Sequence, residues 1–518
     1  MGKLLVTIGG SGSACGTAIL HGLSANLTEL QGTMDVLYLD KDATNGTTSD
    51  FRKKLQLYGR MTEELAPAEG RDGRQFARID INDNYDDWTI EGILGNDAEE
   101  PLENYCATAS QSFLPLFYTD TERRMKLSVG FERHPNIGSL VFDGIKENDK
   151  FREKIMHVIK SGGRTQIFIT GSIFGGTGAS MFANLAEYIR SLVKDESPEL
   201  QNKLYIGGVL LTPYFSIPLA PAEELNNNPV KDDNITEATQ TALGYYASIE
   251  NLVCGGGKER THGKAIFDAL YLLGFSPKTQ INNDGSPAPY CKGGSSQLRD
   301  ACIVELLSAC AAAHFFNATQ DGRDDLKVNQ SDVKENIFRL SLGGTEGALP
   351  AVTWDNIPRE SAMKLQQMLR FALLLCCVLQ PDWQAATSKR NALYARWLKK
   401  GAKVKPVQLQ AARDYLFEYL RFIYQVACTN AGGERICAHL ANPEKLWDAI
   451  ELSVKPSLKN CANTFKLLAD IVPVNDLTNL RPIIDALNGK YWLAKAKDET
   501  ALLNSLYAAC TIEEKGDE

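Results

Sequence analysis

Two glycine-rich stretches of this 518-residue chain each follow an apolar run. The first is IGGSGSACG, residues 8–16, and the second is GSIFGGTGAS, residues 171–180. Glycine in a turn costs backbone entropy and adds no side-chain packing, so it indicates that another group approaches the main chain closely. N–H groups at a helix N-terminus form a cradle for an anion, and the helix dipole adds positive potential. Two such turns predict one phosphorylated ligand held from two sides.

Each turn alone is also what a tight strand–helix connection requires, so neither is specific by itself. The chain contains no G-x-x-x-x-G-K-[ST] pattern, which excludes a P-loop nucleotide site. A dinucleotide-binding Rossmann fold stays open as an alternative, because Asp40 ends the second strand, where an acid would bind a ribose. That alternative, an oxidoreductase, leaves the second glycine turn unexplained.

The elements that must position these turns are apolar strands alternating with helical stretches over residues 1–320. Continuous apolar strands separated by helices predict a parallel sheet covered on both faces. A long, mostly apolar helix is expected over residues 295–316, buried between two layers. The expected strands are KLLVTI (3–8), MDVLYLD (34–40), TQIFIT (165–170), KLYIGGVLLTPYF (203–215) and DALYLLGFS (268–276).

Helical patterns dominate the C-terminal part. Residues 326–358 form a connecting segment that can hold one or two strands, and residues 359–510 are expected to form an α-helical C-terminal domain before a solvated tail at 511–518. The expected helices are 359–379, 383–400, 408–428, 443–472 and 480–510. This domain offers a surface for an unidentified protein partner.

Composition predicts an ordinary cytoplasmic globular protein, with 44% hydrophobic and 23% charged residues. The net charge of −9 argues against a nucleic-acid partner or an anionic membrane surface. Twelve cysteines occur without a CxxC pair and six histidines are scattered, which predicts reduced thiols and no metal cluster in the protein. The most apolar stretch, residues 371–379, is too short to span a bilayer.

The second glycine turn carries a family resemblance. TQIFITGSIFGGTGASMFANLAEYI, residues 165–189, resembles the tubulin/FtsZ superfamily signature, in which a strand runs into G-G-G-T-G-[ST]-G and then a helix. The chain departs from that signature at Phe174 and Ser180, which stand where the family has glycine, while Ala179 fits its small-residue position. The matching residues are Gly175, Gly176, Thr177 and Gly178.

Supporting signals follow in family order over residues 1–325. The first glycine turn is similar to the family's first glycine loop, LDKDATN (39–45) to its acidic loop, VLLTPYF (209–215) to its "VVTxPF" strand end, and GFERHPNIG (130–138) occupies the place of the loop that faces the terminal phosphate. The form is closest to a divergent prokaryotic tubulin-like group. The resemblance implies a parallel-sheet, Rossmann-like nucleotide-binding domain over residues 1–325, with residues 295–316 as its central helix.

The resemblance also implies a site for GTP or GDP with Mg²⁺, and no protein ligand is assigned to the metal. Asp42 would act through Mg²⁺ or water, and Asp300, one turn into the central helix, would read the purine edge. The expected nucleotide-contacting residues are Gly9, Gly10, Ser11, Gly12, Asp42, Ala43, Gly138, Gly171, Gly175, Gly176, Thr177, Gly178, Thr212 and Asp300.

A catalytic loop follows the central helix in FtsZ-type proteins and reaches into the next subunit. Here that place reads NATQDGRDD, residues 317–325, in which Asp321 and Asp324 keep the three-residue spacing of the acids but lack an Asn two residues before the first. The family's Glu and Arg for ribose and base are also replaced, by SIPLAP. The resemblance implies a slow GTPase activated by self-association into a filament or oligomer. A nucleotide-sensing scaffold that does not hydrolyse GTP remains an alternative.

Overall fold

The structure is a computed structural model. It describes residues 2–42, 44–66, 73–82, 90–94, 100–106, 111–124, 131, 135–161, 163–194, 196–222, 231–249, 251–253, 265–291, 294–320, 326, 337–339, 351–378, 409–454 and 498–511.

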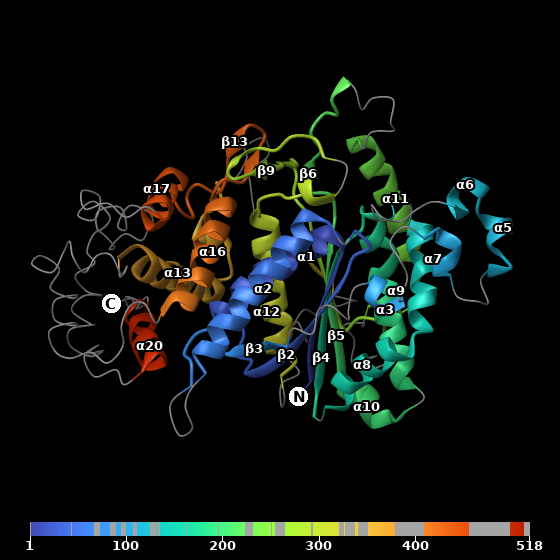
Figure 1. The fold of residues 1–518 in the computed structure, drawn as a ribbon, viewed down its shortest axis with the longest axis horizontal. Helices are drawn as coiled ribbons and strands as arrows, with labels where there is room; N and C mark the ends of the chain where they lie inside the picture. The colour runs from blue at the N-terminus through green and yellow to red at the C-terminus, as the bar shows by residue number, and fades with distance from the viewer. Residues whose placement is uncertain are drawn as a thin grey trace, which may run out of the picture.

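A seven-stranded sheet with the order β11-β7-β5-β4-β1-β2-β3 forms the centre of the molecule, and every pairing in it is parallel (Figure 1). Every residue of β1, β4 and β5 is buried, as expected for strands covered on both faces. The predicted fold class is confirmed. The strands are β1 (Gly2–Ile8), β2 (Gly32–Leu39), β3 (Ile79–Asn82), β4 (Thr165–Ser172), β5 (Leu204–Leu211), β7 (Ala269–Leu273) and β11 (Ile337–Arg339).

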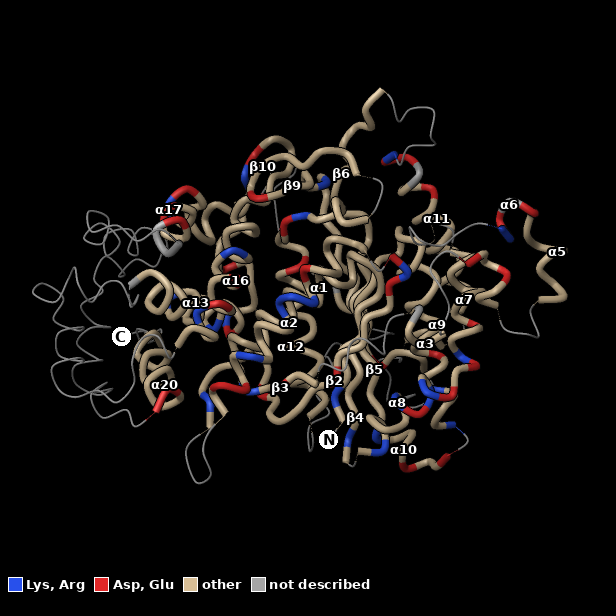
Figure 2. Tube along the Cα trace, in the orientation of Figure 1, with Lys and Arg blue, Asp and Glu red and all other residues tan. Residues whose placement is uncertain are grey.

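Helices cover both faces of this sheet. In Figure 1, α1 (Gly9–Ser24), α2 (Gly46–Glu64) and α12 (Ile303–Ala318) lie on one side, and α7 (Pro135–Lys146), α8 (Asp149–Lys160) and α9 (Gly176–Lys194) lie on the other. The central strands carry few charged residues. Most of the described charged residues lie on the outer helices and loops (Figure 2). The remaining helices before α12 are α3 (Ile90–Leu94), α5 (Leu114–Phe117), α6 (Asp120–Arg123), α10 (Pro198–Lys203) and α11 (Asp232–Ser248).

Helix α12 begins at Ile303, so the expected start at residue 295 is wrong. Residues 294–296 form only a short 3₁₀ turn, and the chain then runs extended to Cys302. Glu305 sets the start of the helix, because its Oε2 accepts a hydrogen bond from the Cys302 N–H at 2.8 Å. The helix therefore begins where a buried carboxylate caps it rather than where the apolar pattern begins.

The described C-terminal helices form a further layer outside α1, α2 and α12 (Figure 1). The described helices over 359–379, 408–428 and the first part of 443–472 agree with the expected ones, whereas the helix expected over 480–510 is wrong in one respect, because Asp498 is extended and caps a helix that begins at Glu499. The helix expected over 383–400 and the ranges 455–472 and 480–497 lie outside the described residues. The helices are α13 (Arg359–Leu373), continued by a π-helical turn (Leu374–Val378), α16 (Gln410–Ala427), α17 (Pro443–Val454) and α20 (Glu499–Ala509).

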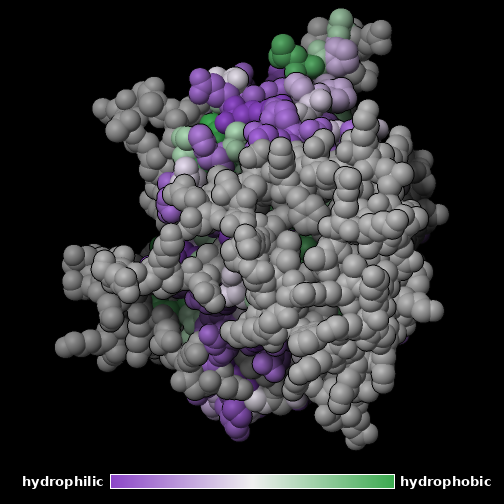
Figure 3. Space-filling model, turned by 90° about the vertical axis from the view of Figure 1, so that its left-hand side faces the viewer, coloured by the Kyte–Doolittle hydropathy of each residue, from purple (hydrophilic) through white to green (hydrophobic). Residues whose placement is uncertain are grey.

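A small sheet that the sequence did not predict ties this layer to the N-terminal part. Its order is β13-β12-β8-β6, and it joins residues on either side of the central helix. A separate hairpin, β9–β10, follows β8 in the sequence. The strands are β6 (Phe215–Ser216), β8 (Thr279–Gln280), β9 (Asn282–Asn283), β10 (Ser286–Pro287), β12 (Asn430–Ala431) and β13 (Glu434–Arg435). On the face turned toward the viewer in Figure 3, the described surface is mostly hydrophilic. Among the described residues, no helix is long and apolar enough to cross a membrane.

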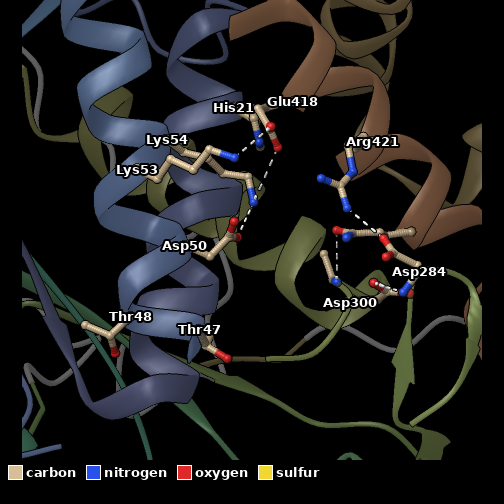
Figure 4. A network of polar contacts seen from close by, with 12 residues as sticks. His21, Thr47, Thr48, Asp50, Lys53, Lys54, Asp284, Asp300, Glu418 and Arg421 are labelled. Carbon is tan, nitrogen blue, oxygen red and sulfur yellow. Dashed lines mark hydrogen bonds and ion pairs between the residues drawn. The ribbon is translucent and has the colours of Figure 1, made fainter. Parts of the chain in front are cut away.

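A buried histidine marks the contact between α1 and α16. The His21 side chain is fully buried and lies beside Glu418 of α16 (Figure 4). Its Nδ1 lies 3.1 Å from the Tyr415 hydroxyl, while its Nε2 has no hydrogen-bond partner. The rings of Tyr419 and Phe422 pack around it, at 5.6 and 4.8 Å between centroids. Burial lowers the pKa of His21 well below its usual range, and the nearby Lys54 ammonium acts in the same direction.

We predict that His21→Phe flattens the acid dependence of stability. Because the folded pKa of His21 is depressed, the unfolded chain binds the extra proton as pH falls below about 6.5, and stability is lost there at up to about 1.4 kcal/mol per pH unit. Phe keeps the ring in its aromatic surroundings and does not titrate. Melting temperatures between pH 8 and pH 5 should fall less steeply for the variant than for the wild type, and equal slopes would contradict the prediction.

Candidate functional site

The two glycine turns lie together at the carboxyl edge of the sheet. β1 and β4 are neighbouring parallel strands, with Thr7 paired to Thr170, and each runs directly into its glycine turn. A Cβ placed on Gly9 would lie 3.5 Å from the Thr177 Cβ and 3.8 Å from the Gly178 nitrogen. The turns therefore touch, and the predicted adjacency is confirmed.

Some of these glycines are explained by packing alone. A Cβ on Gly12 would lie 2.6 Å from the Thr170 carbonyl oxygen, and one on Gly178 would lie 2.5 Å from the Ser172 carbonyl oxygen. Both contacts are with main-chain atoms, which cannot move aside. Gly12 and Gly178 thus allow α1 and α9 to lie against β4, as a tight strand–helix turn requires.

The other residues of the turns are open to a ligand. Gly9, Gly10 and Ser11 in the first turn, and Gly175 and Gly176 in the second, are half-buried between stretches that are fully buried. Gly9 has a φ of +70°, which a residue with a side chain adopts only with strain. The first turns of both helices leave N–H groups without intrahelical partners. Neither α1 nor α9 carries an acidic residue in its first turn to compete with an anion.

The loop after β2 lies beside the first glycine turn. The Asp42 Oδ1 accepts hydrogen bonds from the Thr44 N–H and Oγ1 at 3.1 and 2.8 Å, and its Oδ2 accepts one from the Gly294 N–H at 2.9 Å. Asp42 therefore organises its own loop and fastens the segment before α12 to it. Ala43 lies outside the described residues.

Two amides that sequence reasoning missed stand over the first turn. The Asn45 Oδ1 accepts the Thr48 N–H at 3.1 Å and so caps α2, while its Nδ2 donates to the Gln297 Oε1 at 2.6 Å. A Cβ on Gly10 would lie 3.1 Å from both polar atoms of the Asn45 amide. An Asn just before the first helical residue is a recognisable N-cap signal, which could have identified Asn45. No sequence signal pointed to Gln297.

Three further predicted contact residues have partners within the protein. Gly171 is a residue of β4, and a Cβ on it would lie 3.2 Å from Phe182. Thr212, just past β5, uses its N–H and hydroxyl on the Leu273 carbonyl. Gly138 was expected in a loop facing the terminal phosphate, but it lies in helix α7, where a Cβ would come within 2.1 Å of the Ser180 Oγ. That expected loop position is wrong: Gly138 is a helix-packing glycine, and residues 132–134 lie outside the described residues.

The expected place of Asp300, one turn inside the central helix, is wrong as well. It precedes α12, and its carboxylate accepts the Asp284 and Gly285 N–H groups at 3.0 and 2.6 Å. Burial raises the pKa of Asp300, and these two hydrogen bonds oppose the shift. Arg421 of α16 binds the Asp284 carboxylate at 2.6 Å (Figure 4). Asp300 thus holds the turn of the β9–β10 hairpin, and a purine contact by it stays a prediction.

A buried ionic network lies behind the second glycine turn. Arg299 donates to the Glu305 Oε1 at 2.6 Å and to the Tyr214 hydroxyl at 2.5 Å, and the same hydroxyl donates to Glu305 at 2.5 Å. Burial opposes ionisation of Glu305, but Arg299 and the hydrogen bonds outweigh it and lower its pKa. Phe174, one of the two departures from the family signature, packs on Tyr214 at 6.1 Å between ring centroids. Phe174 therefore connects the turn to the start of α12.

A buried thiol beside this network, that of Cys15, is held in its protonated form. Burial raises the pKa of the Cys15 thiol to about 12, and the Glu305 carboxylate acts in the same direction. Among the described residues, no three His, Cys, Asp or Glu side chains are grouped to hold a metal ion.

Asp321 and Asp324 lie outside the described residues, but the end of α12 that leads to them is defined. Arg164, just before β4, donates to the Thr319 and Gln320 carbonyl oxygens at 3.0 and 2.7 Å. Gln166 donates to the Phe316 carbonyl oxygen at 2.8 Å. Residue 320 therefore lies at the amino edge of the sheet, opposite the glycine turns.

Comparison with known proteins agrees with this geometry. Residues 133–231 match a family model described as tubulin-like, and the matched range contains β4, the second glycine turn, α9 and β5. A search of curated proteins gave no match to the chain.

We predict that Glu305→Gln destabilises the protein by about 3 kcal/mol, because it leaves the Arg299 charge buried without its partner. The measurement is the shift of the chemical denaturation midpoint at neutral pH. Glu444→Gln is the matched control: it removes a carboxylate that is 68% exposed from its pair with Arg435, which should change stability by less than about 1 kcal/mol. Equal shifts for the two variants would contradict a stabilising role for the buried network.

Proposed function

We propose, from the premise that this chain belongs to the tubulin/FtsZ-like superfamily, that it binds GTP or GDP with Mg²⁺ at its paired glycine turns and hydrolyses GTP slowly when it self-associates. The observation that carries the proposal is the contact between the turns, with Gly9 against Thr177 and Gly178. The half-buried main chain at Gly10, Ser11, Gly175 and Gly176 supports it. A ligand there would lie against two helix N-termini at once.

The chemistry needs little beyond this arrangement. Phosphoryl transfer depends mainly on positioning and on stabilising the charge of the phosphate oxygens, and pre-positioned N–H groups in a partly dry site supply both. The Thr177 hydroxyl would add a donor. Mg²⁺, when bound, would neutralise phosphate charge. The attacking water would be positioned by carboxylates, for which Asp321 and Asp324 are the proposed source.

The position of α12 supports hydrolysis between subunits. Its last described residues, held by Arg164, lie at the edge opposite the glycine turns. A helix of 16 residues is about 24 Å long. Residue 320 is therefore far from the nucleotide proposed for the same chain. In a head-to-tail stack, acids that follow it would instead lie near the nucleotide of the neighbouring copy.

A reducing compartment, the cytoplasm, is supported by the thiols. All ten described cysteines are free, and all but Cys291 are buried. Disulfides in an oxidising compartment would be expected to use some of them.

Gly176→Val should lower GTP affinity at least about tenfold, roughly 1.4 kcal/mol, because a branched side chain blocks approach of an anion to the second turn. Gly244→Val is the control, since Gly244 lies on exposed α11 with nothing within 4 Å of its Cβ position. Isothermal titration and thermal shift with GTP, ATP and NAD in Mg²⁺ provide the measurement. Unchanged GTP binding by a folded Gly176→Val protein would refute the site, and a larger shift with NAD would favour a dinucleotide enzyme.

The double change of Asp321 and Asp324 to Asn should leave GTP binding intact and abolish turnover, because Asn keeps the shape but loses the charge that orients water. Wild-type turnover should rise faster than linearly with protein concentration. A specific rate that does not depend on concentration, or that survives the double change, would contradict hydrolysis by a neighbour's acids. Binding with no turnover at any concentration would instead identify a nucleotide-sensing scaffold.

A further inference from the structure

Helix α16 is bound to α1 and α2 through polar side chains that are buried between them. The Tyr415 hydroxyl donates to the Leu20 carbonyl oxygen at 3.2 Å, and the His21 Nδ1 lies 3.1 Å from the same hydroxyl. One turn further along α16, Glu418 lies 3.9 Å from the buried Lys54 of α2. Figure 4 shows His21, Lys54 and Glu418 meeting there. These three residues and Tyr415 are called here the α16 contact.

The hydrogen bonds of His21 leave one ring nitrogen with nothing to bind. Because the Tyr415 hydroxyl hydrogen is used on Leu20, Nδ1 is the donor between the two side chains, and Nε2 then carries the lone pair. Nε2 has no hydrogen-bond partner, although the side chain is fully buried. A proton added there would make a buried cationic donor without an acceptor, which a protein interior holds only at a high cost in free energy.

The charges that face His21 oppose such a proton as well. Burial depresses the pKa of His21, and the Lys54 ammonium acts in the same direction. Glu418, the carboxylate beside the ring, is already shared by Lys54 at 3.9 Å and Lys53 at 3.6 Å, and Asp50 binds Lys54. The carboxylates are therefore committed to the two lysines rather than to an imidazolium ion.

The other groups around the ring do not respond to pH near neutrality. Helix α12 faces this part of α1 with the uncharged methyl group of Ala309. Burial raises the pKa of the tyrosines here, so they keep their protons; they are Tyr58 of α2, Tyr415 and Tyr419 of α16, and Tyr507 of α20. Among the described residues at the contact, His21 is therefore the side chain whose ordinary pKa, about 6.5, lies between pH 5 and 8.

The far end of α16 and the central sheet are held by groups that a proton does not disturb. The Thr429 Oγ1 accepts the Ile303 N–H at 3.2 Å, and the Cys428 carbonyl oxygen accepts the Asn282 Nδ2 at 3.1 Å. Strand β4 is fully buried and contains no Asp, Glu, His, Lys or Arg. Acid that breaks the α16 contact therefore leaves these two regions in place.

We infer that His21 is an acid-operated latch: a proton on its ring releases α16 from α1 and α2 around residues 413–422, while the parallel sheet stays folded. The latch acts without nucleotide and so goes beyond the proposed function. A phenylalanine would fill the same aromatic surroundings without an unpaired nitrogen, so histidine weakens the closed contact and adds a response to pH. Because α1 and α2 both begin beside the first glycine turn, the latch controls how firmly the C-terminal layer holds that edge.

The size of the response follows from proton linkage. In the open contact His21 regains its ordinary pKa of about 6.5, whereas the closed contact depresses that pKa. The open state therefore binds one more proton, and its population rises up to about tenfold for each pH unit below about 6.5. The closed contact is fully stable above that pH and loses stability as pH falls. Between pH 7.5 and pH 5.5 the open population should increase about tenfold.

Native-state hydrogen exchange, corrected for the intrinsic effect of pH on exchange, measures this population. Amides of residues 413–422 should open about tenfold more at pH 5.5 than at pH 7.5, while those of β4 should not change. His21→Phe should remove the increase in α16. His439→Phe is the matched control, because His439 is an exposed histidine in the C-terminal part of the chain, and this variant should keep the increase.

Four results would overturn the latch: no increase in the wild type, equal increases in α16 and β4, an increase that survives His21→Phe, or one that is lost in His439→Phe. Equal increases would mean that acid unfolds the protein as a whole. His21→Leu repeats the test with a second apolar side chain that does not titrate. If neither variant at residue 21 folds, the comparison of α16 with β4 in the wild type decides.

Discussion

Helices α1 and α9 lie so close to strand β4 that a methyl group on Gly12 or Gly178 would collide with main-chain oxygens at 2.6 and 2.5 Å. The rest of the arrangement at this edge depends on that contact. This close packing brings the N-termini of the two helices side by side. Helix α9 packs on β4, the strand that precedes it, and α1 packs on β4 as the neighbour of its own strand β1. Gly12 and Gly178 thus allow the helices to pack closely, whereas other glycines of the same turns leave the main chain accessible to a ligand. The sequence alone could not distinguish the two groups, since both belong to the same motifs.

The parallel sheet and its helices could be predicted because their signals are local. Continuous apolar strands and the helical periodicity between them need no knowledge of distant residues. The start of α12 could not be predicted, because a buried ion pair between Arg299 and Glu305 and a cap at Cys302 fix it, and these depend on Tyr214, about ninety residues earlier. Asp300 was misplaced for the same reason: its partners, at residues 284 and 285, are set by a hairpin with two-residue strands.

The candidate site was predictable in part. The two turns follow from their motifs, and their meeting at one edge follows from the single ligand that both were predicted to hold. Asn45 and Gln297, in contrast, come together only through the fold, from positions about 250 residues apart. The C-terminal layer shows the same limit. Its helices can be predicted from the sequence, but the packing of α16 on α2 cannot. At that contact Glu418 lies 3.9 Å from the buried Lys54 and 3.6 Å from Lys53. Single-sequence patterns identify elements well and their partners poorly.

Charge at the glycine edge decides what kind of anion it suits. The chain has a net charge of −9, but salt screens distant charges within about 8 Å, so only nearby groups matter to a ligand. Those are the N–H groups of α1 and α9, which attract an anion, and the loop beside them, in which the carboxylates of Asp40 and Asp42 repel it and the buried Lys41 ammonium between them attracts it. Asp40 accepts the Thr48 hydroxyl at 2.9 Å and Asp42 accepts three donors, so part of each negative charge is already compensated by the protein. The two carboxylates would still repel the phosphates of the proposed ligand. A divalent cation carried in with those phosphates would offset this repulsion, which is the physical reason for proposing a metal–nucleotide complex rather than a free anion.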